Sequence, residues 1–442
     1  MTGLACRRRL DTRPTAYAIG VTTVAPHVDV VHLSLVIGGA LNDSAGSRLG
    51  KVADLIVRLG GDHYPPVTGV LATVAGRQVF VPAEAVGDIG IRHVTLTQTR
   101  LDLQPFERRP QEVLLKEDVL DRQLINVDGA RLVRTNDIEI ARVEGWYRVV
   151  GVDTSPRGFV RRLVPRRVAG AVGAGTMLDW ASVEPFTGHV PTVRLRIPHP
   201  KLARLHPAEV ADLVEAASHR EGEEILAAVS ADVEREADVF EELDDQHQVE
   251  FIEERSDAEA AALLARMESD DAADLINGLS EERREPILLL LPSVQQRRIR
   301  ALLGYDPTTA GGLMSPDFLC LFTQATCQEA LDRIRRASAP ADSLAWVYVM
   351  NERHRLKGAV QVVELLRADP NAAVGEVAEA ARAVRPDADL EEVARVMTDF
   401  DLTVVPVVDD EQRVIGVITV DDVLEIVLPR GWRRNFRVFG DE

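Results

Sequence analysis

The chain has 442 residues, 46% hydrophobic and 27% charged, a composition typical of a globular protein with about three domains. Its net charge of −19 is uneven, because residues 1–200 carry 25 basic and 20 acidic side chains whereas residues 201–442 carry 26 and 50. The acidic second half disfavours binding to nucleic acid. Three cysteines exclude a disulfide framework and fit a reducing cytoplasm. No apolar run approaches the ~18 residues of a membrane span.

The N-terminal part divides into a leader and a strand-rich region. Residues 1–29 hold an arginine cluster interrupted by Asp11 and Pro14, so we expect a disordered leader rather than a signal peptide. From residue 30, β-branched runs such as DVVHLSLVIG and RQVFVPAEAV alternate with Gly and Pro turns, as strands do. The segment GSRLGKVADLIV (46–57) aligns with GARLVRTNDIEI (129–140), which indicates an internal repeat.

This repeat predicts two small β-barrels, because short antiparallel strands remove their edges by curling closed. The pattern resembles the PRC-barrel family, with one unit at 30–112, a second at 113–168 and a linker at 169–200. Arg48 and Arg131 occupy equivalent positions in the two copies. They fit either a ligand contact or a salt bridge to Asp54 or Asp137, and we favour the salt bridge.

Residues 201–304 are expected to be entirely helical, because apolar residues recur there at helical spacing. The recurring submotif EVADLV, EAAALL and DAADLI predicts a superhelical array of short helices. In SDDAADL, Ser269 is the expected N-cap, with Asp270 and Asp271 in the first turn and Asp274 one turn later. Asp270 and Asp271 need no function beyond starting a helix, but Asp274 adds a third negative charge to the same side.

The stretch YDPTTAGGLMS, residues 305–315, combines two glycines with Pro307 and is followed by Pro316, a composition that helices and strands disfavour. We expect a hinge here. Its residues are Tyr305, Thr309, Gly311, Gly312 and Pro316.

Residues 316–430 alternate helix and strand and repeat once with an offset of 58 residues. Each copy contains a predicted hairpin whose second strand runs into a helix. Thr419 ends the second such strand and Asp422 follows three residues later, which suits the phosphate and ribose of a nucleotide; a helix cap explains the pair equally well. The pattern resembles CBS domains, tandem modules that bind adenine nucleotides, although Gln361 and Glu364 depart from it in the first copy.

The acidic array, the Y-x3-TAGGLM-[ST]-P stretch and the CBS pair together resemble the cytosolic part of MgtE-type magnesium transporters, over roughly residues 200–430. The expected fold is multidomain α+β, with N-terminal small β-barrels, a central helical superhelix and a C-terminal tandem CBS pair. The resemblance implies that Mg²⁺ binds between acidic faces of the helical domain and the CBS pair. By motif position, its ligands would be Asp270, Asp271, Asp274, Asp421, Asp422 and Glu425.

A transporter of this family continues into membrane helices after its CBS pair, whereas this sequence ends in a basic-aromatic tail at 431–442. We therefore expect a cytoplasmic Mg²⁺-responsive regulatory protein without a pore of its own. We also expect a homodimer through the CBS pair, and contact with a membrane transporter or another protein through the β-barrel domains. The alternative is an adenine-nucleotide-sensing regulatory or scaffold protein with structural acidic helices. No nucleophile–base motif or phosphate loop occurs, so we do not expect an enzyme.

Overall fold

The computed structural model describes residues 30–60, 63–99, 104–163, 176–186, 201–337 and 339–428. These residues form two compact units, which we describe separately. The first unit comprises the chain up to Asp121 together with Thr135–Ala181, and the second comprises Arg122–Arg134 and the chain from Ser182 onward. Within the described ranges, none of the helices has the length and apolar character that a membrane crossing requires. The expected leader (1–29) and tail (431–442) lie outside them.

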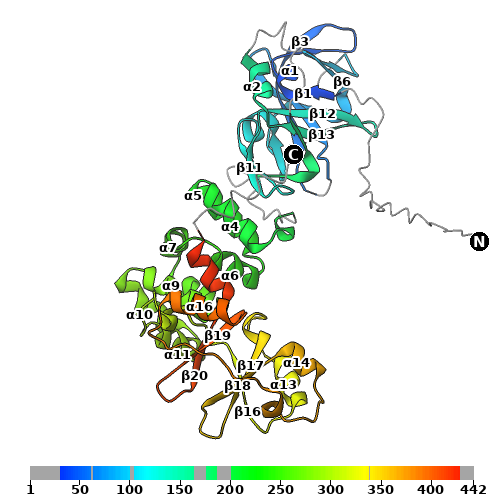
Figure 1. The fold of residues 1–442 in the computed structure, drawn as a ribbon. Coiled ribbons are helices and arrows are strands. Elements are labelled where there is room, and N and C mark those ends of the chain that lie inside the picture. Colours follow the sequence, from blue (N-terminus) through cyan, green and yellow to red (C-terminus); the bar gives the residue numbers. More distant parts are fainter. Residues whose placement is uncertain are drawn as a thin grey trace, which may run out of the picture. The chain divides into compact units, whose positions relative to one another are not determined.

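The first unit is built from strands, as the β-branched runs predict (Figure 1, blue and cyan). One sheet has the order β6-β7-β2-β3-β4-β5-β8, with β9 also paired to β3, and a second sheet has the order β1-β12-β13-β14. The strands are β1 (Val30–His32), β2 (Ala40–Asn42), β3 (Arg48–Arg58), β4 (Val67–Val74), β5 (Arg77–Pro82), β6 (Val86–Gly90), β7 (His93–Leu96), β8 (Gln104–Pro105), β9 (Glu112–Leu114), β12 (Asp137–Val143), β13 (Trp146–Asp153) and β14 (Met177–Asp179). The helical elements are α1 (Leu33–Val36), η1 (Ala83–Ala85), η2 (Leu115–Val119), α2 (Pro156–Leu163) and η3 (Trp180–Ser182). Closure of these strands into PRC-type barrels stays a prediction.

The internal repeat is preserved in one buried aspartate per copy. Asp54 on β3 accepts hydrogen bonds from the backbone N–H of Lys116 (2.8 Å) and Glu117 (3.1 Å) in η2. Asp137 on β12 likewise accepts one from the backbone N–H of Ser34 (3.0 Å) in α1. Each aspartate therefore holds a short helical turn through its backbone amides.

The expected salt bridges of these aspartates to Arg48 and Arg131 are wrong. Asp137 instead pairs with Arg161 of α2, at 2.8 Å between Oδ2 and Nη1, and both side chains are fully buried. Burial raises the pKa of Asp54 to about 7, although the backbone amides that it accepts from oppose the rise.

Part of the expected linker at 169–200 is also structured. Met177–Asp179 forms β14, and Val183–Pro185 forms β15, which pairs with β10 in the second unit. Sheet pairing of short segments depends on partners far away in sequence, which local composition does not reveal.

The second unit begins with a three-stranded sheet, order β11-β10-β15, followed by the predicted helical array (Figure 1, green). Ile125 of the sheet and Phe186 after it belong to the same hydrophobic core as the helices. The strands are β10 (Gln123–Asn126), β11 (Arg131–Arg134) and β15 (Val183–Pro185). The helices are η4 (Leu202–Arg204), α4 (Pro207–Ala216), α5 (His219–Val229), α6 (Val233–Glu241), α7 (Asp245–Glu253), α8 (Asp257–Leu264), α9 (Ser269–Gly278), α10 (Glu281–Leu290) and α11 (Ser293–Leu302).

The C-terminal part of the second unit repeats as predicted. The hairpin of β17 and β18 leads into α14, and the hairpin of β19 and β20 leads into α17, with the 58-residue offset retained between the strand starts. The elements are α12 (Ala310–Leu313), β16 (Leu319–Phe322), α13 (Cys327–Ile334), η5 (Ser343–Ala345), β17 (Trp346–Met350), β18 (Leu356–Gln361), α14 (Val362–Arg367), α15 (Val374–Val377), α16 (Leu390–Asp399), β19 (Val404–Val408), β20 (Val414–Thr419) and α17 (Val420–Val427).

The predicted hinge lies against the second repeat. The N–H of Gly311 donates to the carbonyl of Pro386 at 2.8 Å, and Ser315 and Val417 exchange two backbone hydrogen bonds at 2.7 and 2.9 Å. Met314 is buried against Gly416 of β20. This stretch therefore joins the helical array to the second repeat by strand-like pairing, and movement within it stays a prediction.

The two glycines of the hinge are explained by close packing rather than by a sharp turn. Neither has a positive φ. A Cβ on Gly311 would lie 2.6 Å from the Tyr305 ring, and one on Gly312 would lie 2.4 Å from the carbonyl oxygen of Asp306. Both contacts are shorter than van der Waals packing allows, so a side chain at either position would displace the segment from the residues against which it packs.

We predict that Gly312→Ala lowers the free energy of unfolding by about 1–3 kcal/mol, because the new methyl group overpacks against backbone atoms that cannot rotate away. Gly304→Ala is the matched control, because its Cβ would lie 3.4 Å from the Ala301 carbonyl oxygen, an ordinary van der Waals contact. Urea denaturation of both variants checks this. Equal stability of the two would contradict the packing argument.

Candidate functional site

The N-terminal end of α9 carries the first three predicted carboxylates. α9 starts at Ser269 with Glu268 as the N-cap residue, so the expected N-cap at Ser269 is wrong by one position. Asp270 and Asp271 are half-buried and Asp274 is exposed. Within the described part of the chain, Oδ1 of Asp270 is buried without a hydrogen-bond partner. A buried carboxylate oxygen without a hydrogen-bond partner is unfavourable unless another group stabilises its charge.

The structure brings these carboxylates to α17 of the second CBS-like repeat, the red helix among the green helices in Figure 1. The charge of Asp422 acts on Asp270 and Glu268, and that of Glu425 acts on Asp271 and Asp274. We call this group the acidic junction. Its members are Glu241, Glu268, Asp270, Asp271, Asp274, Asp422 and Glu425.

Two members of the acidic junction were missed from the sequence. Glu241 ends α6 and accepts a hydrogen bond from the backbone N–H of Glu268 at 2.6 Å. Both lie outside the two motifs, and only the tertiary fold places Glu241 beside α9. The predicted Asp421 is exposed, and its charge acts on Asp422.

Burial and repulsion between carboxylates raise the pKa values of most members of the acidic junction. Burial, followed by the charge of Asp422, raises the pKa of Glu268 to about 7. Burial likewise raises the pKa of Glu241 to about 7. Although Asp274 is exposed, partial desolvation by the surrounding protein and the charges of Asp245 and Glu425 raise its pKa to about 6. Burial and the neighbouring carboxylates raise the pKa of Asp270 and Asp271 well above the usual range. The junction therefore holds more negative charge than its surroundings stabilise.

This donor set fits a hard divalent cation. All members of the acidic junction offer carboxylate oxygens, the ligands that Mg²⁺ and Ca²⁺ prefer. A bound cation would also lower the raised pKa values, because it reverses the sign of the local field. Among the described residues, three potential metal-ligand atoms lie within 4.8 Å of one another only in a different group of side chains. The carboxylates of the acidic junction are therefore further apart than the ligands of a closed metal site.

That other set is His219 and Glu223 of α5 with Glu254 after α7. The two ring nitrogens of His219 lie 2.9 Å from carboxylate oxygens of Glu250 and Glu254. Contact with Glu254 raises the pKa of His219, and the charged imidazolium is then paired on both sides. An ion pair accounts for this arrangement.

The predicted nucleotide residues Thr419 and Asp422 form a helix cap. The N–H of Thr419 donates to Oδ2 of Asp422 at 2.8 Å, and Thr419 is 8% exposed. The N–H of Asp422 donates in return to the Thr419 hydroxyl at 3.4 Å. The capping interpretation is thus present in the structure, and Asp422 also belongs to the acidic junction.

A cavity of about 450 Å³ lies between the two CBS-like repeats. Trp346, Tyr348 and Gln361 line it from the first repeat, and Arg382 and Phe400 line it from the second. The Arg382 guanidinium lies 4.3 Å from the centre of the Phe400 ring, and the buried Tyr348 hydroxyl has no hydrogen-bond partner among the described residues. Thr419 and Asp422 are not among its lining residues. The cavity therefore lies on the Gln361 side of the pair, where the sequence pattern is weaker.

Comparisons with known proteins bear on both sites. Residues 205–308 match the sequence model of the MgtE intracellular N domain, and residues 374–429 match that of the CBS domain. The second half of the chain is MgtE-like. The acidic junction thus lies where the MgtE-like N domain meets the CBS pair.

Curated relatives extend this match. The magnesium transporter MgtE of Thermus thermophilus is 35% identical over 197 residues, which is 43% of this chain and 43% of that protein. MgtE of Bacillus subtilis is 25% identical over 193 residues, with the same coverage. The chain thus spans less than half the length of these transporters. A solved structure, the cytosolic domain of the Mg²⁺ channel MgtE in complex with ATP, is 32% identical, with 53% of this chain and 94% of that chain covered and a TM-score of 0.49.

The raised pKa values predict how stability depends on pH. Between about pH 4.5 and 7, folded Glu241 and Glu268 hold protons that the unfolded chain has released, so the free energy of unfolding falls as pH rises through this window. We expect chelator-treated protein to melt at a higher temperature near pH 6 than near pH 7.5, and Glu268→Gln to reduce that difference.

Glu391→Gln on the exposed start of α16 removes the same charge away from the acidic junction and serves as the control. Melting curves followed by circular dichroism provide the measurement. Identical pH slopes for Glu268→Gln and Glu391→Gln would show that the acidic junction does not titrate in this window.

Proposed function

We propose that the MgtE-like half is a cytosolic Mg²⁺-responsive regulatory module, in which divalent cations hold the helical N domain against the second CBS repeat. The observation that supports this proposal is the acidic junction: the pKa values of the α9 carboxylates are raised by burial and by the charges of Asp422 and Glu425 on α17. Relatives that share this half are magnesium transporters.

The proposed switch follows from competition between attraction and repulsion. One hydrophobic core runs from the helical array through Met314 to Val423 of α17, and Arg298 of α11 pairs with Asp317 at 2.8 Å. Both favour the closed arrangement. Two carboxylates 4 Å apart repel by about 1 kcal/mol in water and about 4 kcal/mol in a protein environment of intermediate polarity. Several such pairs therefore oppose closure until a cation neutralises them.

The predicted ligands remain part of this proposal. Asp270, Asp271 and Asp274 of α9 and Asp422 and Glu425 of α17 face one another, so we retain them as candidate ligands. Glu241 and Glu268 join them. Asp421 stays a candidate on motif position alone.

We predict opposite effects of Asp270→Asn with Asp422→Asn in the two ionic conditions. In chelator, the double variant should melt at a higher temperature than the wild type, because two repelling charges are gone. With saturating Mg²⁺ it should lose most of the wild-type stabilisation, which reaches about 2.7 kcal/mol when the ligand is at 100 times its dissociation constant. Calorimetric titration and small-angle scattering at matched ionic strength measure binding and compaction.

Asp332→Asn on α13 is the control, because it removes a half-buried carboxylate of the first CBS repeat that pairs with Arg335 at 2.6 Å, away from the acidic junction. It should respond to Mg²⁺ as the wild type does. If the wild type melts and scatters identically in chelator and in Mg²⁺, the proposed switch is refuted.

A second function is supported by the cavity between the CBS repeats. Its aromatic walls, the Arg382 guanidinium and the unpartnered Tyr348 hydroxyl suit a planar base with an attached anion. We propose adenine nucleotide binding here. The earlier candidates Thr419 and Asp422 stay predictions for a separate nucleotide contact at the start of α17.

We predict saturable ATP or AMP binding that Arg382→Ala weakens by about tenfold or more, through loss of one charged and stacked contact. Thr419→Val is the comparison. If Thr419→Val abolishes binding and Arg382→Ala does not, the nucleotide occupies the α17 cap instead. Fluorescence titration in the presence and absence of Mg²⁺ distinguishes the two.

The homodimer through the CBS pair stays a prediction. Apolar side chains exposed on α14 and α17 support it, since side chains such as Leu366 (64% exposed) and Val427 (57%) would be covered in a dimer. Contact of the N-terminal β unit with a transporter or another protein also stays a prediction.

A further inference from the structure

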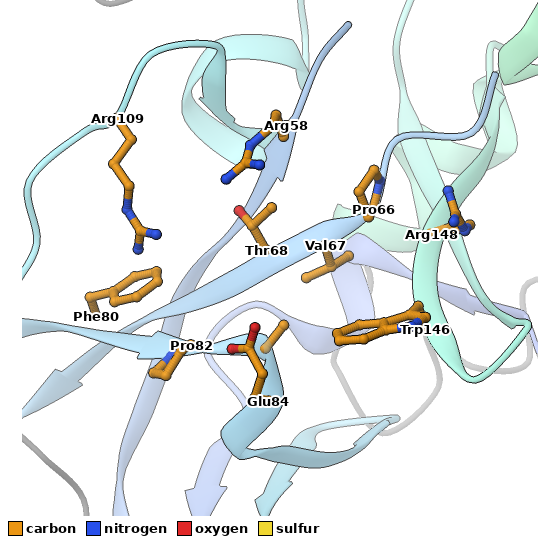
Figure 2. Close-up of a pocket in the computed structure, with 11 residues that line it drawn as sticks. Arg58, Pro66, Val67, Thr68, Phe80, Pro82, Glu84, Arg109, Trp146 and Arg148 are labelled. Atoms are coloured by element: carbon orange, nitrogen blue, oxygen red, sulfur yellow. The ribbon is translucent and has the colours of Figure 1, made fainter. Parts of the chain in front are cut away.

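A cavity of about 330 Å³ opens in the first unit, where strands of both repeat copies meet (Figure 2). Arg58 ends β3, Phe80 lies on β5 and Glu84 lies in η1, all from the first copy. Trp146 starts β13 of the second copy. The volume is at the small end of ligand sites, so the cavity suits one small molecule.

One side of the cavity is basic. Arg58 and Arg109 both approach the buried carboxylate of Glu112, at 4.0 Å (Nη2 to Oε1) and 3.6 Å (Nε to Oε2). Their side chains are nevertheless 50% and 49% exposed. The Arg109 guanidinium also lies 4.3 Å from the centre of the Phe80 ring, which orients it. The single carboxylate of Glu112 therefore pairs with two guanidinium groups, and both of them still reach the cavity. One negative charge against two positive charges leaves this side of the cavity positive.

The opposite side of the cavity carries an acidic and an aromatic side chain, with Arg148 near Trp146; its Nη1 donates to the Tyr64 carbonyl at 2.8 Å. In Figure 2 Glu84 and Trp146 lie below Val67 and Thr68, across the cavity from Arg58 and Arg109. Trp146 is 49% exposed, an unusual exposure for an indole ring. A carboxylate beside an accessible indole face suits an ammonium group, through charge and cation–π attraction. Pro66, Val67 and Pro82 supply apolar walls between the two sides.

We propose that this cavity binds a small zwitterion. Its carboxylate lies at Arg58 and Arg109, its ammonium group lies at Glu84 and the face of Trp146, and its carbon chain crosses the apolar walls. A simple anion would face Glu84 without compensation, and a simple cation would face three arginines, Arg58, Arg109 and Arg148. The zwitterion satisfies both sides and fits the volume.

The experiment is calorimetric titration of the full chain with glycine, 4-aminobutyrate and 6-aminohexanoate, together with hexanoate and hexylammonium. At least one ω-amino acid should bind saturably, about tenfold or more tightly than hexanoate and hexylammonium. Arg109→Gln and Glu84→Gln should each weaken that binding by a similar factor. Trp146→Phe should remove the accompanying change in tryptophan fluorescence.

Arg77→Gln is the matched control, because Arg77 is an exposed arginine at the start of β5 outside the cavity. It should leave binding unchanged, and circular dichroism verifies that each variant is folded. Equal affinity for hexanoate and 6-aminohexanoate would reduce the site to an anion site and overturn the proposal. Absence of saturable binding across the series would overturn it as well, as would binding that neither Arg109→Gln nor Glu84→Gln weakens.

Discussion

The strand-like pairing of Ser315 with Val417 is the constraint on which the second unit depends. It docks the connection between the helical array and the second CBS repeat onto β20, whose last residue starts α17. α9 and α17 therefore meet with their acidic ends together, and the apolar core beneath keeps them there. The same backbone geometry that completes the fold thus produces the crowding of carboxylates that a cation would relieve.

Local patterns in the sequence predicted much of this half. Helical periodicity placed the short helices between 201 and 304, and the 58-residue offset predicted the two hairpins that run into α14 and α17. These features depend on residues close together in the chain, so composition and spacing reveal them. The α+β architecture of the chain is confirmed for the same reason.

Features that depend on distant contacts were not predictable in this way. Glu241 joins the acidic junction only because the fold brings the end of α6 to Glu268, and no spacing rule connects Glu241 or Glu268 to α17. The glycines of the connecting stretch looked like turn residues but are small because other backbone passes close by. The cavity of the first unit combines side chains from both repeat copies, which the division into separate barrels did not anticipate.

The buried aspartates of the repeat carry a consequence for how the first unit tolerates truncation. α1 lies at the start of the first copy, yet its Ser34 amide is bound by Asp137 of the second copy. Loss of residues 30–36 would therefore remove the Ser34 amide from Asp137 and the strand that pairs with β12, as well as the Leu35 carbonyl that accepts a hydrogen bond from Arg92 of the first copy. Damage at the start of the chain would also appear in the later half of the unit, so the two copies are interdependent in space although they are consecutive in sequence.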